Sequence, residues 1–340
     1  MSDPKIQIKN LYKIFGKSPQ KALKSVQSGM GKDALREETG HVLGVDNVSL
    51  DIAPQNIQVV MGLSGSGKST LIRHINRLIE PTAGEILVDG ENVLTMDKDA
   101  LRDLRRFKMS MVFQHFGLFP HRRVIENVTY GLIVQGVDEN EAEKRAKQWI
   151  SRVGLEGYEN NYPGQLSGGM RQRVGLARGL ATDADILLMD EAFSALDPLI
   201  RYDMQSILID LQKELHKTIV FITHDLDEAL RLGDNIAILR DGHLVQQGSA
   251  QDIVLRPADD YIEDFIKDIN RARVIKLGSI MQPLGRGKLP DSAPRLDADT
   301  ILQDALMVVA QSKGNTVIVE ERGQPKGKIT TRAVIEALHG

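Results

Sequence analysis

The chain has 340 residues, which is enough for one large domain and a smaller second one. Its formal net charge of −3 and its aromatic content of 4% disfavour a nucleic-acid-binding protein, which needs a basic surface or stacking platforms. The absence of cysteine excludes disulfides and thiolate metal sites. The polar first ten residues predict no signal peptide, and no apolar run reaches the roughly 18–20 residues that span a bilayer, so we expect no membrane pore from this chain.

The first elements predicted along the chain are two β-strands separated by a charged insertion. Residues 6–15 alternate apolar and polar positions as an edge strand would, and residues 42–52 resume the strand pattern. Residues 17–41 lie between them and carry many charges with scattered apolar positions. We therefore predict one or two short surface helices inserted between two strands.

Residues 58–70, QVVMGLSGSGKST, predict a phosphate-binding loop between a strand and a helix. Residues 59–61 have the character of a buried strand end, and apolar residues recur at helical spacing after the loop. The stretch satisfies G-x-x-x-x-G-K-[ST] in the context that this motif requires, so a chance match is disfavoured. Small residues let successive backbone N–H groups curl around a phosphate. The predicted nucleotide-binding residues are Gly62, Ser64, Gly65, Ser66, Gly67, Lys68, Ser69 and Thr70.

Lys68 and Ser69 have separate predicted roles within this loop. The Lys68 ammonium is suited to reach the β- and γ-phosphates, and the Ser69 hydroxyl is suited to ligate Mg²⁺. The start of the helix adds positive potential at the same point. ATP with Mg²⁺ is therefore the expected ligand.

Three further strands are predicted to end in polar side chains. One ends in Asp190 followed by Glu191, another in His224, and a third in Gln114. Because open α/β sheets bind ligands at the carboxyl ends of their strands, we expect these side chains to gather beside Ser69. We predict Asp190 and Gln114 as Mg²⁺ ligands, Glu191 as the base that polarises water, and His224 as a contact of the γ-phosphate. An ordinary acidic pair and a structural histidine are the alternatives.

The LSGGM segment at 166–170 resembles a second phosphate loop leading into a helix that begins near Met170. The first loop already serves one nucleotide. A second helix N-terminus in a helical subdomain, predicted at about 115–175, makes sense if it completes a site on another copy of the chain. The residues predicted to act in trans from this segment are Leu166, Ser167, Gly168, Gly169 and Met170.

The remaining pattern predicts an α/β domain followed by a smaller domain. Strands alternate with helices over residues 1–270, which predicts a largely parallel sheet. A linker is predicted at 271–294, where Pro and Gly are frequent from residue 279 onward. Residues 295–340 follow a helix, strand, turn, strand, helix pattern and predict a small α+β domain.

These motifs occur in the order that is typical of the ATP-binding subunits of ABC transporters. The resemblance is carried by GLSGSGKST, Gln114, LSGGM, ILLMDE, SALD at 194–197 and His224. It implies a P-loop NTPase fold with a RecA-like core, and a head-to-tail homodimer that sandwiches two ATP molecules. Each ATP would lie between Lys68 of one copy and the LSGGM segment of the other, with Asp197 also acting in trans. Phe15 matches the aromatic residue that stacks on adenine, and a core residue at a strand end is the alternative.

Met170 stands where most such ATPases have Gln, and this departure is informative. Together with the insertion at 17–41 and EAFSALDPLIR at 191–201, it resembles the glycine betaine/proline betaine importer subgroup. The resemblance implies a peripheral subunit on the cytoplasmic face of the plasma membrane. Its partners would be an integral-membrane permease, contacted by Gln114 and the helical subdomain, and indirectly a solute-binding protein. Glycine betaine, proline betaine, choline and N-oxide solutes all stay open.

The tail, beginning with IMQP at 280–283, resembles one cystathionine-β-synthase (CBS) type repeat. The subgroup commonly carries two such repeats, which form a module regulated by an adenosine nucleotide or by ionic strength. A single repeat leads to the hypothesis that two copies pair across the dimer. A dimerisation tail without a ligand is the alternative.

Two other function classes compete with an energising subunit of a compatible-solute importer. Soluble ABC proteins that act on ribosomes or DNA generally carry two ATPase units or a long coiled-coil insertion, and this chain resembles neither. A nucleotide-sensing regulator with a vestigial ATPase is disfavoured by the intact set of Lys68, Asp190, Glu191 and His224.

Overall fold

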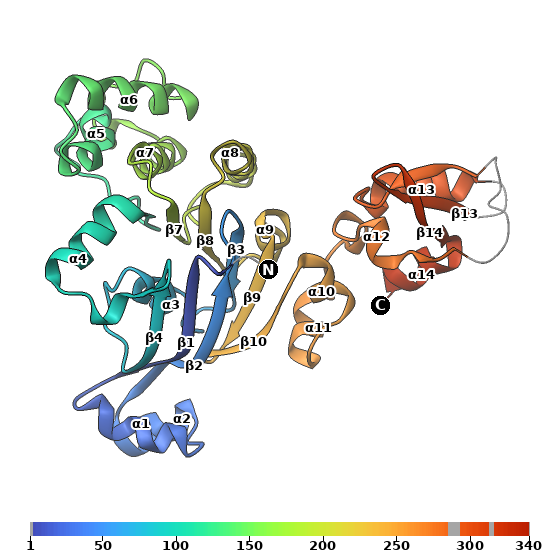
Figure 1. The fold of residues 1–340 in the computed structure, drawn as a ribbon, viewed down its shortest axis with the longest axis horizontal. Helices are drawn as coiled ribbons and strands as arrows, with labels where there is room; N and C mark the ends of the chain where they lie inside the picture. The colour runs from blue at the N-terminus through green and yellow to red at the C-terminus, as the bar shows by residue number, and fades with distance from the viewer. Residues whose placement is uncertain (1–2, 285–292, 313–315, 340) are drawn as a thin grey trace. The chain divides into compact units, whose positions relative to one another are not determined.

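The computed structural model describes residues 3–284, 293–312 and 316–339. The chain divides into two compact units, Met1–Val245 and Gln246–Gly340, each of which is described by itself. Figure 1 gives the helix and strand labels used below.

The larger sheet of the first unit has the order β10-β9-β3-β8-β7-β6. Its pairs β3–β8, β3–β9, β6–β7 and β7–β8 are parallel, which confirms the largely parallel sheet predicted from the sequence. Strands β3, β7 and β8 are buried along their whole length, which explains their continuous apolar runs. The strands are β3 (Ile57–Met61), β6 (Met109–Val112), β7 (Ile186–Asp190), β8 (Thr218–Thr223), β9 (Asn235–Arg240) and β10 (His243–Gly248).

The second sheet of this unit has the order β2-β1-β4-β5, and its pairs are antiparallel. It contains β1 (Ile6–Phe15), β2 (Val42–Ile52), β4 (Ala83–Val88) and β5 (Glu91–Asn92). The prediction of an edge strand at 6–15 is wrong, because β1 pairs with β2 on one side and with β4 on the other. Its alternation reflects one face buried in the core, through Ile6, Ile8 and Leu11.

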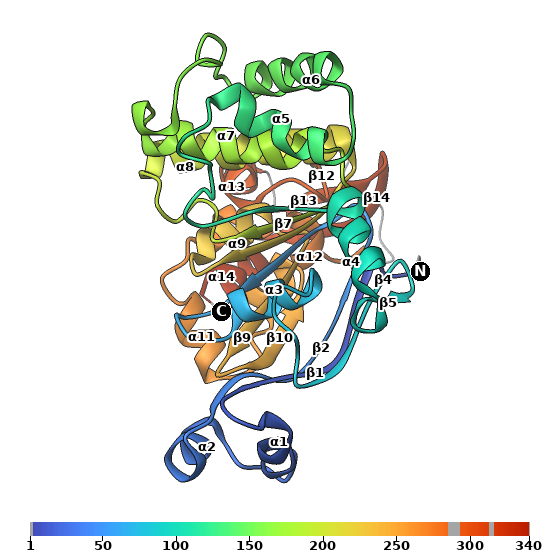
Figure 2. The ribbon, with the colours of Figure 1, turned by 90° about the vertical axis from the view of Figure 1, so that its left-hand side faces the viewer.

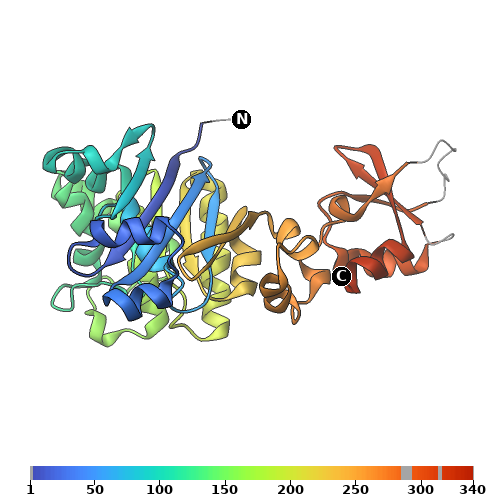
Figure 3. The ribbon, with the colours of Figure 1, turned by 90° about the horizontal axis from the view of Figure 1, so that it is seen from below.

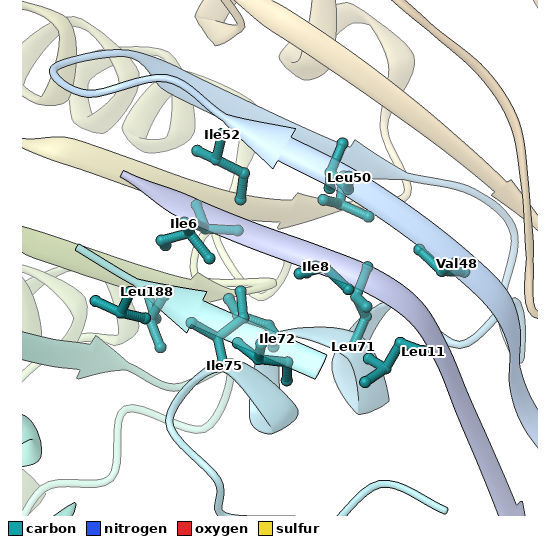
Figure 4. Close-up of a cluster of buried hydrophobic side chains, with 14 of the residues drawn as sticks. Ile6, Ile8, Leu11, Val48, Leu50, Ile52, Leu71, Ile72, Ile75 and Leu188 are labelled. Atoms are coloured by element: carbon teal, nitrogen blue, oxygen red, sulfur yellow. The ribbon is translucent and has the colours of Figure 1, made fainter. Parts of the chain in front are cut away.

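Helix α3 (Lys68–Ile75) packs in the core that the two sheets share. Figure 4 shows Leu71, Ile72 and Ile75 of α3 gathered with apolar side chains of β1 and β2 and with Leu188 of β7. The apolar periodicity runs further along the chain, but the helix ends at Ile75 and Leu78 is half exposed. This packing fixes the N-terminus of α3 against the end of β3.

His74 of α3 is fully buried, and burial lowers its pKa to about 4. The unfolded chain therefore binds more protons than the folded one between about pH 6.5 and pH 4, so the folded state loses stability as the pH falls through this window. We expect wild type to lose about 2 kcal/mol more than His74→Gln between roughly pH 7.5 and pH 5. Urea unfolding followed by the fluorescence of the single tryptophan, Trp149, measures this difference. Equal losses in the two proteins would contradict it.

The helical layer of the first unit consists of α5 (Val124–Val134), α6 (Glu139–Arg152) and α7 (Gly168–Ala181) (Figure 2). The three helices share one apolar core, against which Trp149 packs with its side chain partly buried. This core extends to Ala181, beyond the end of the helical subdomain expected at about 175, because α7 continues its apolar spacing to that point.

The remaining helices of the first unit lie between its strands in the chain. They are α1 (Pro19–Gln27), α2 (Lys32–Thr39), α4 (Lys98–Asp103), α8 (Pro198–Leu215) and α9 (Leu226–Leu232). Two helices in the 17–41 insertion agree with the sequence prediction. A short π-helix (Leu104–Lys108) follows α4, and 3₁₀ turns span Val93–Thr95 and Pro163–Gln165.

The second unit contains a sheet of order β11-β14-β13-β12 and five helices among its described residues (Figure 3). The helices are α10 (Ala250–Leu255), α11 (Asp260–Ile266), α12 (Leu277–Ile280), α13 (Leu302–Gln311) and α14 (Thr331–His339), with a 3₁₀ turn at Arg271–Arg273. The strands are β11 (Gln282–Pro283), β12 (Arg295–Asp297), β13 (Thr316–Glu321) and β14 (Gln324–Thr330). The helix, strand, strand, helix order predicted for the tail is present.

The domain boundary lies earlier than the expected position at 270, and residues 271–283 are not a linker. Gln251 of α10 donates from Nε2 to the Val274 carbonyl at 2.8 Å. Its Oε1 accepts from the Lys276 N–H at 2.9 Å and from the Ser279 hydroxyl at 2.8 Å. These bonds tie α10 to the segment that precedes the sheet of the second unit, and β11 is a strand of that sheet. The Pro- and Gly-rich part of the expected linker at 285–292 lies outside the described residues.

Candidate functional site

The loop between β3 and α3 requires glycine at two positions. Gly62 and Gly67 have φ of 150° and 100°, in the region that favours glycine. A Cβ atom on Gly62 would lie 2.1 Å from the Leu239 carbonyl oxygen, and one on Gly67 would lie 2.3 Å from the Gly44 carbonyl oxygen. The loop is therefore pressed against the backbone of two neighbouring strands, which fixes its shape.

Lys68 begins α3 and is buried, with 4% of its surface exposed. Its Nζ donates to the carbonyl oxygens of Gly62 at 2.8 Å and Leu63 at 3.0 Å. Burial lowers the pKa of Lys68, and the nearby carboxylates of Glu191 and Asp190 oppose this shift. The loop thus holds a partly desolvated cation at its own centre, where it attracts phosphate strongly.

Ser69 meets Asp190 as the sequence predicted. The Ser69 hydroxyl donates to Asp190 Oδ1 at 2.7 Å, and Asp190 is 1% exposed. The chemistry fits Mg²⁺, which takes oxygen ligands and usually binds one or two protein groups beside phosphates. Among the described residues no cluster of three or more His, Asp or Glu offers a complete metal cage.

Arg73 is a site residue that the sequence reasoning missed. Its Nε and Nη2 donate to Asp190 Oδ2 at 3.2 and 3.0 Å. The available signal was spacing, because Arg73 follows Ser69 by one helical turn and so lies on the same face of α3. Arg73 therefore orients the carboxylate that faces Ser69.

Three other predicted site residues lie around the Glu191 carboxylate. Gln114 Nε2 donates to Glu191 Oε2 at 3.0 Å, and His224 Nδ1 lies 3.4 Å from the same oxygen. Lys68 Nζ lies 3.7 Å from Oε1. The strand ends thus meet beside the P-loop, as expected for a parallel sheet. Gln114 contacts Glu191 rather than the pair formed by Ser69 and Asp190, so its role as a metal ligand stays a prediction.

Phe15 lies near the P-loop at the end of β1. A Cβ atom on Gly44 would lie 2.7 Å from Phe15 Cε2, and the Gly44 carbonyl in turn abuts Gly67. Phe15 is 40% exposed, and Lys13 Nζ lies 4.9 Å from the centroid of its ring. This geometry leaves part of the ring accessible to a base, and stacking on adenine stays a prediction.

The LSGGM segment forms the N-terminus of α7, which begins at Gly168 rather than near Met170. Ser167 is exposed and caps the helix, with its Oγ accepting from the Met170 N–H at 3.2 Å. Leu166 is buried and Met170 partly buried in the core of the helical layer. Gly169 is closely packed, because a Cβ atom there would lie 2.7 Å from Ile200 Cγ2.

The residues predicted to act in trans are not part of the cluster around Glu191. Figures 1 and 2 agree in placing α7 in the helical layer, apart from α3. Asp197 is exposed and caps α8 by accepting from the Ile200 N–H at 3.1 Å. The exposed capping groups of α7 and α8 are therefore available to a second molecule, and their action in trans stays a prediction.

The fold and this cluster define a P-loop ATPase of the ABC class. The sequence profile described as ABC transporter matches residues 45–194. The glycine betaine transport ATP-binding protein OpuAA of Bacillus subtilis (strain 168) is 52% identical over 292 residues, covering 86% of this chain and 70% of that protein. The chain belongs to the family of ABC transporter ATP-binding proteins.

Two further comparisons show a relative that matches along almost the whole chain and a similar solved structure that is a dimer. The trimethylamine N-oxide transport system ATP-binding protein TmoW of Ruegeria pomeroyi (strain ATCC 700808 / DSM 15171 / DSS-3) is 45% identical over 338 residues, covering 99% of this chain and 98% of that protein. The solved dimeric structure of MJ0796, a bacterial ABC transporter cassette, matches with a TM-score of 0.62 and 33% identity, over 72% of this chain and 98% of that chain. A dimeric post-hydrolysis state of that cassette holds ADP and Pi.

Among the described residues, no helix combines the length and apolar character needed to cross a membrane.

Proposed function

We propose that the chain is the ATP-hydrolysing subunit that energises an ABC importer for compatible solutes of the glycine betaine type. The observation that carries this proposal is the cluster of Lys68, Gln114, His224 and Glu191 beside the paired Ser69 and Asp190. These groups supply a phosphate-binding cation, oxygen ligands and a base at one sheet edge. An ATPase with these parts intact is suited to turnover rather than to nucleotide sensing alone.

The proposed chemistry is phosphoryl transfer to water. Ser69 and Asp190 would hold Mg²⁺, which neutralises charge on the β- and γ-phosphate oxygens when it is bound. Glu191 accepts the proton of the attacking water, and Gln114 orients that carboxylate. Lys68 stabilises the charge that develops on the phosphate, and His224, whose Nδ1 lies 3.4 Å from Glu191 Oε2, would contact the γ-phosphate.

The proposed working form is a head-to-tail homodimer with two ATP molecules between its subunits. Support comes from the exposed Ser167 at the start of α7, a helix of 14 residues whose N-terminal N–H groups favour phosphate. Support also comes from the dimeric cassette structures to which the chain is similar. ATP drives closure because it binds the closed pair more tightly than the open one.

The proposed partners are integral-membrane permease subunits and, indirectly, a solute-binding protein. Gln114 and the helical layer would contact the permease. The chain would then be a peripheral subunit at the cytoplasmic face of the plasma membrane. The soluble-ATPase and sensor alternatives are not favoured, because the chain matches transport ATP-binding proteins over 82–99% of its length.

Residues 295–340, within the second unit, are proposed as a single CBS-like regulatory repeat that senses an adenosine nucleotide or ionic strength. Support comes from the four-stranded sheet of this unit with helices α13 and α14. Two apolar side chains of these helices, Met307 and Ile335, are 66% and 52% exposed. Such groups are suited to pair with a second copy across the dimer.

Trimethylamine N-oxide is the second candidate solute, and one observation favours it. The chain matches TmoW along 98% of that protein, whereas it covers 70% of OpuAA. Glycine betaine and trimethylamine N-oxide both carry a trimethylated, positively charged nitrogen. A binding protein with a pocket of aromatic side chains could therefore bind either solute.

Uptake by a reconstituted transporter tests the proposal. The full chain, its permease and its solute-binding protein are placed in liposomes loaded with ATP, and uptake of labelled glycine betaine and trimethylamine N-oxide is measured at several salt concentrations. We expect ATP-dependent uptake of at least one solute, and a loss of about 10²-fold or more with Lys68→Ala. ATP turnover that is independent of the permease, with no uptake of either solute, would contradict the proposal.

A further inference from the structure

The insertion α1–α2 is anchored next to the proposed nucleotide site. It leaves the sheet β2-β1-β4-β5 after Phe15 and returns to it at Val42, and these two residues are partners in the pairing of β1 with β2. Leu35 of α2 is fully buried in a small core that the insertion builds with β1 and β2, made of Ile14, Ala22, Val26, Leu35 and Leu43. Gln20 of α1 also donates to the Thr82 carbonyl at 2.9 Å. The insertion is therefore an ordered arm and not a loose loop.

Lys32 is the first residue of α2, and its side chain reaches the P-loop. Its Nζ donates to the Gly65 carbonyl oxygen at 3.2 Å and lies 3.5 Å from Asp241 Oδ1. The turn that carries Asp241 is itself tied to the loop, because the Gly242 N–H donates to the Ser66 carbonyl at 3.1 Å. The Lys32 ammonium thus lies at the rim of the P-loop, bound to a neutral carbonyl and to one carboxylate.

We propose that Lys32 is a second phosphate-binding cation of the ATP site, supplied by the insertion and acting together with Lys68. This inference rests on the nucleotide site proposed above. A polyphosphate in the loop carries several negative charges and outcompetes a neutral carbonyl for the ammonium. The four rotatable bonds of lysine let Nζ turn from Gly65 toward a bound phosphate without moving α2.

The chemistry of Lys32 differs from that of Lys68 in its exposure to solvent. Lys68 is 4% exposed, whereas the Lys32 side chain is 32% exposed, so salt screens the Lys32 contribution more strongly. Asp241 is 62% exposed and would repel phosphate unless Lys32 lies between them. Lys32 therefore recognises the phosphate chain that ATP and ADP share, and it contributes nothing to the binding of adenosine.

Equilibrium binding to the full-length protein tests this assignment. Kd values for ATP, ADP and adenosine are measured for wild type and Lys32→Gln at about 50 mM and about 500 mM salt. We expect Lys32→Gln to raise the Kd for ATP and for ADP about 3- to 10-fold at low salt, and most of this increase to disappear at high salt. The Kd for adenosine should stay unchanged. Lys32→Arg keeps the charge and should bind within about 2-fold of wild type.

Lys21 and Lys68 supply the controls. Lys21 is exposed on α1, and Lys21→Gln makes the same charge change on the same insertion without altering Kd. Lys68→Ala should lose ATP binding in the same assay. If Lys68→Ala loses binding but Lys32→Gln matches wild type at low salt, the assignment of Lys32 fails and the nucleotide site stands. If Lys68→Ala keeps wild-type affinity, the proposed nucleotide site itself fails.

Discussion

Glu191→Gln is expected to lower ATP turnover by about 10²–10⁴-fold and to accumulate an ATP-bound dimer. The amide keeps the size of the side chain and its contact with Gln114, but it cannot accept the proton of the attacking water. ATP still binds, because Lys68 and the loop glycines are unchanged, and closure is no longer reversed by hydrolysis. Phosphate release and size-exclusion chromatography with ATP or ADP measure the two effects.

Glu85→Gln is the matched control, since Glu85 is exposed on β4 of the second sheet. It should turn over ATP at the wild-type rate and stay monomeric in ADP. A Glu191→Gln protein that remained monomeric in ATP and kept wild-type turnover would remove Glu191 as the base.

Ser167→Arg is expected to abolish hydrolysis while the monomer binds ATP within about 2-fold of wild type. Ser167 is exposed at the N-terminus of α7 and has no part in the cluster around Lys68. An arginine side chain there would occupy the space that a partner's triphosphate needs, and the lost cap would cost the helix about 1 kcal/mol. Steady-state turnover and ATP binding below the dimerisation concentration separate the two effects.

Ser167→Thr tests the same position with the capping hydroxyl retained. It should keep most of the turnover, since threonine also accepts from the Met170 N–H. Loss of ATP binding by monomeric Ser167→Arg would place this segment in the site of its own chain rather than in that of a partner.

The cluster around Glu191 could be predicted from the sequence because local patterns and one topological rule specify it. Asp190 ends the buried strand β7, His224 follows the buried strand β8, and Gln114 follows the partly buried strand β6. Parallel strands bring their carboxyl ends to one edge. The P-loop glycines were equally predictable, since the backbone at Gly62 and Gly67 leaves no room for a side chain.

Features that depend on tertiary partners were predicted less well. The alternation of β1 shows one buried face, but it does not say whether strands flank both edges, and here β2 and β4 do. The segment 271–283 looked like a linker, yet Gln251, far away in the sequence, holds it in place. Arg73 and Lys32 were not predicted, because each makes its contact with a strand or loop that is distant in the sequence.

Glu191 has φ of 45°, a backbone conformation that disfavours residues with a side chain by about 1–2 kcal/mol. The Ser194 hydroxyl and N–H both donate to the Glu191 carbonyl, at 2.9 and 3.2 Å, and help to hold it there. A glycine at this position would relax the chain and remove the proposed base. The carboxylate is thus kept at a cost in stability, and selection for heat tolerance alone would tend to eliminate that residue.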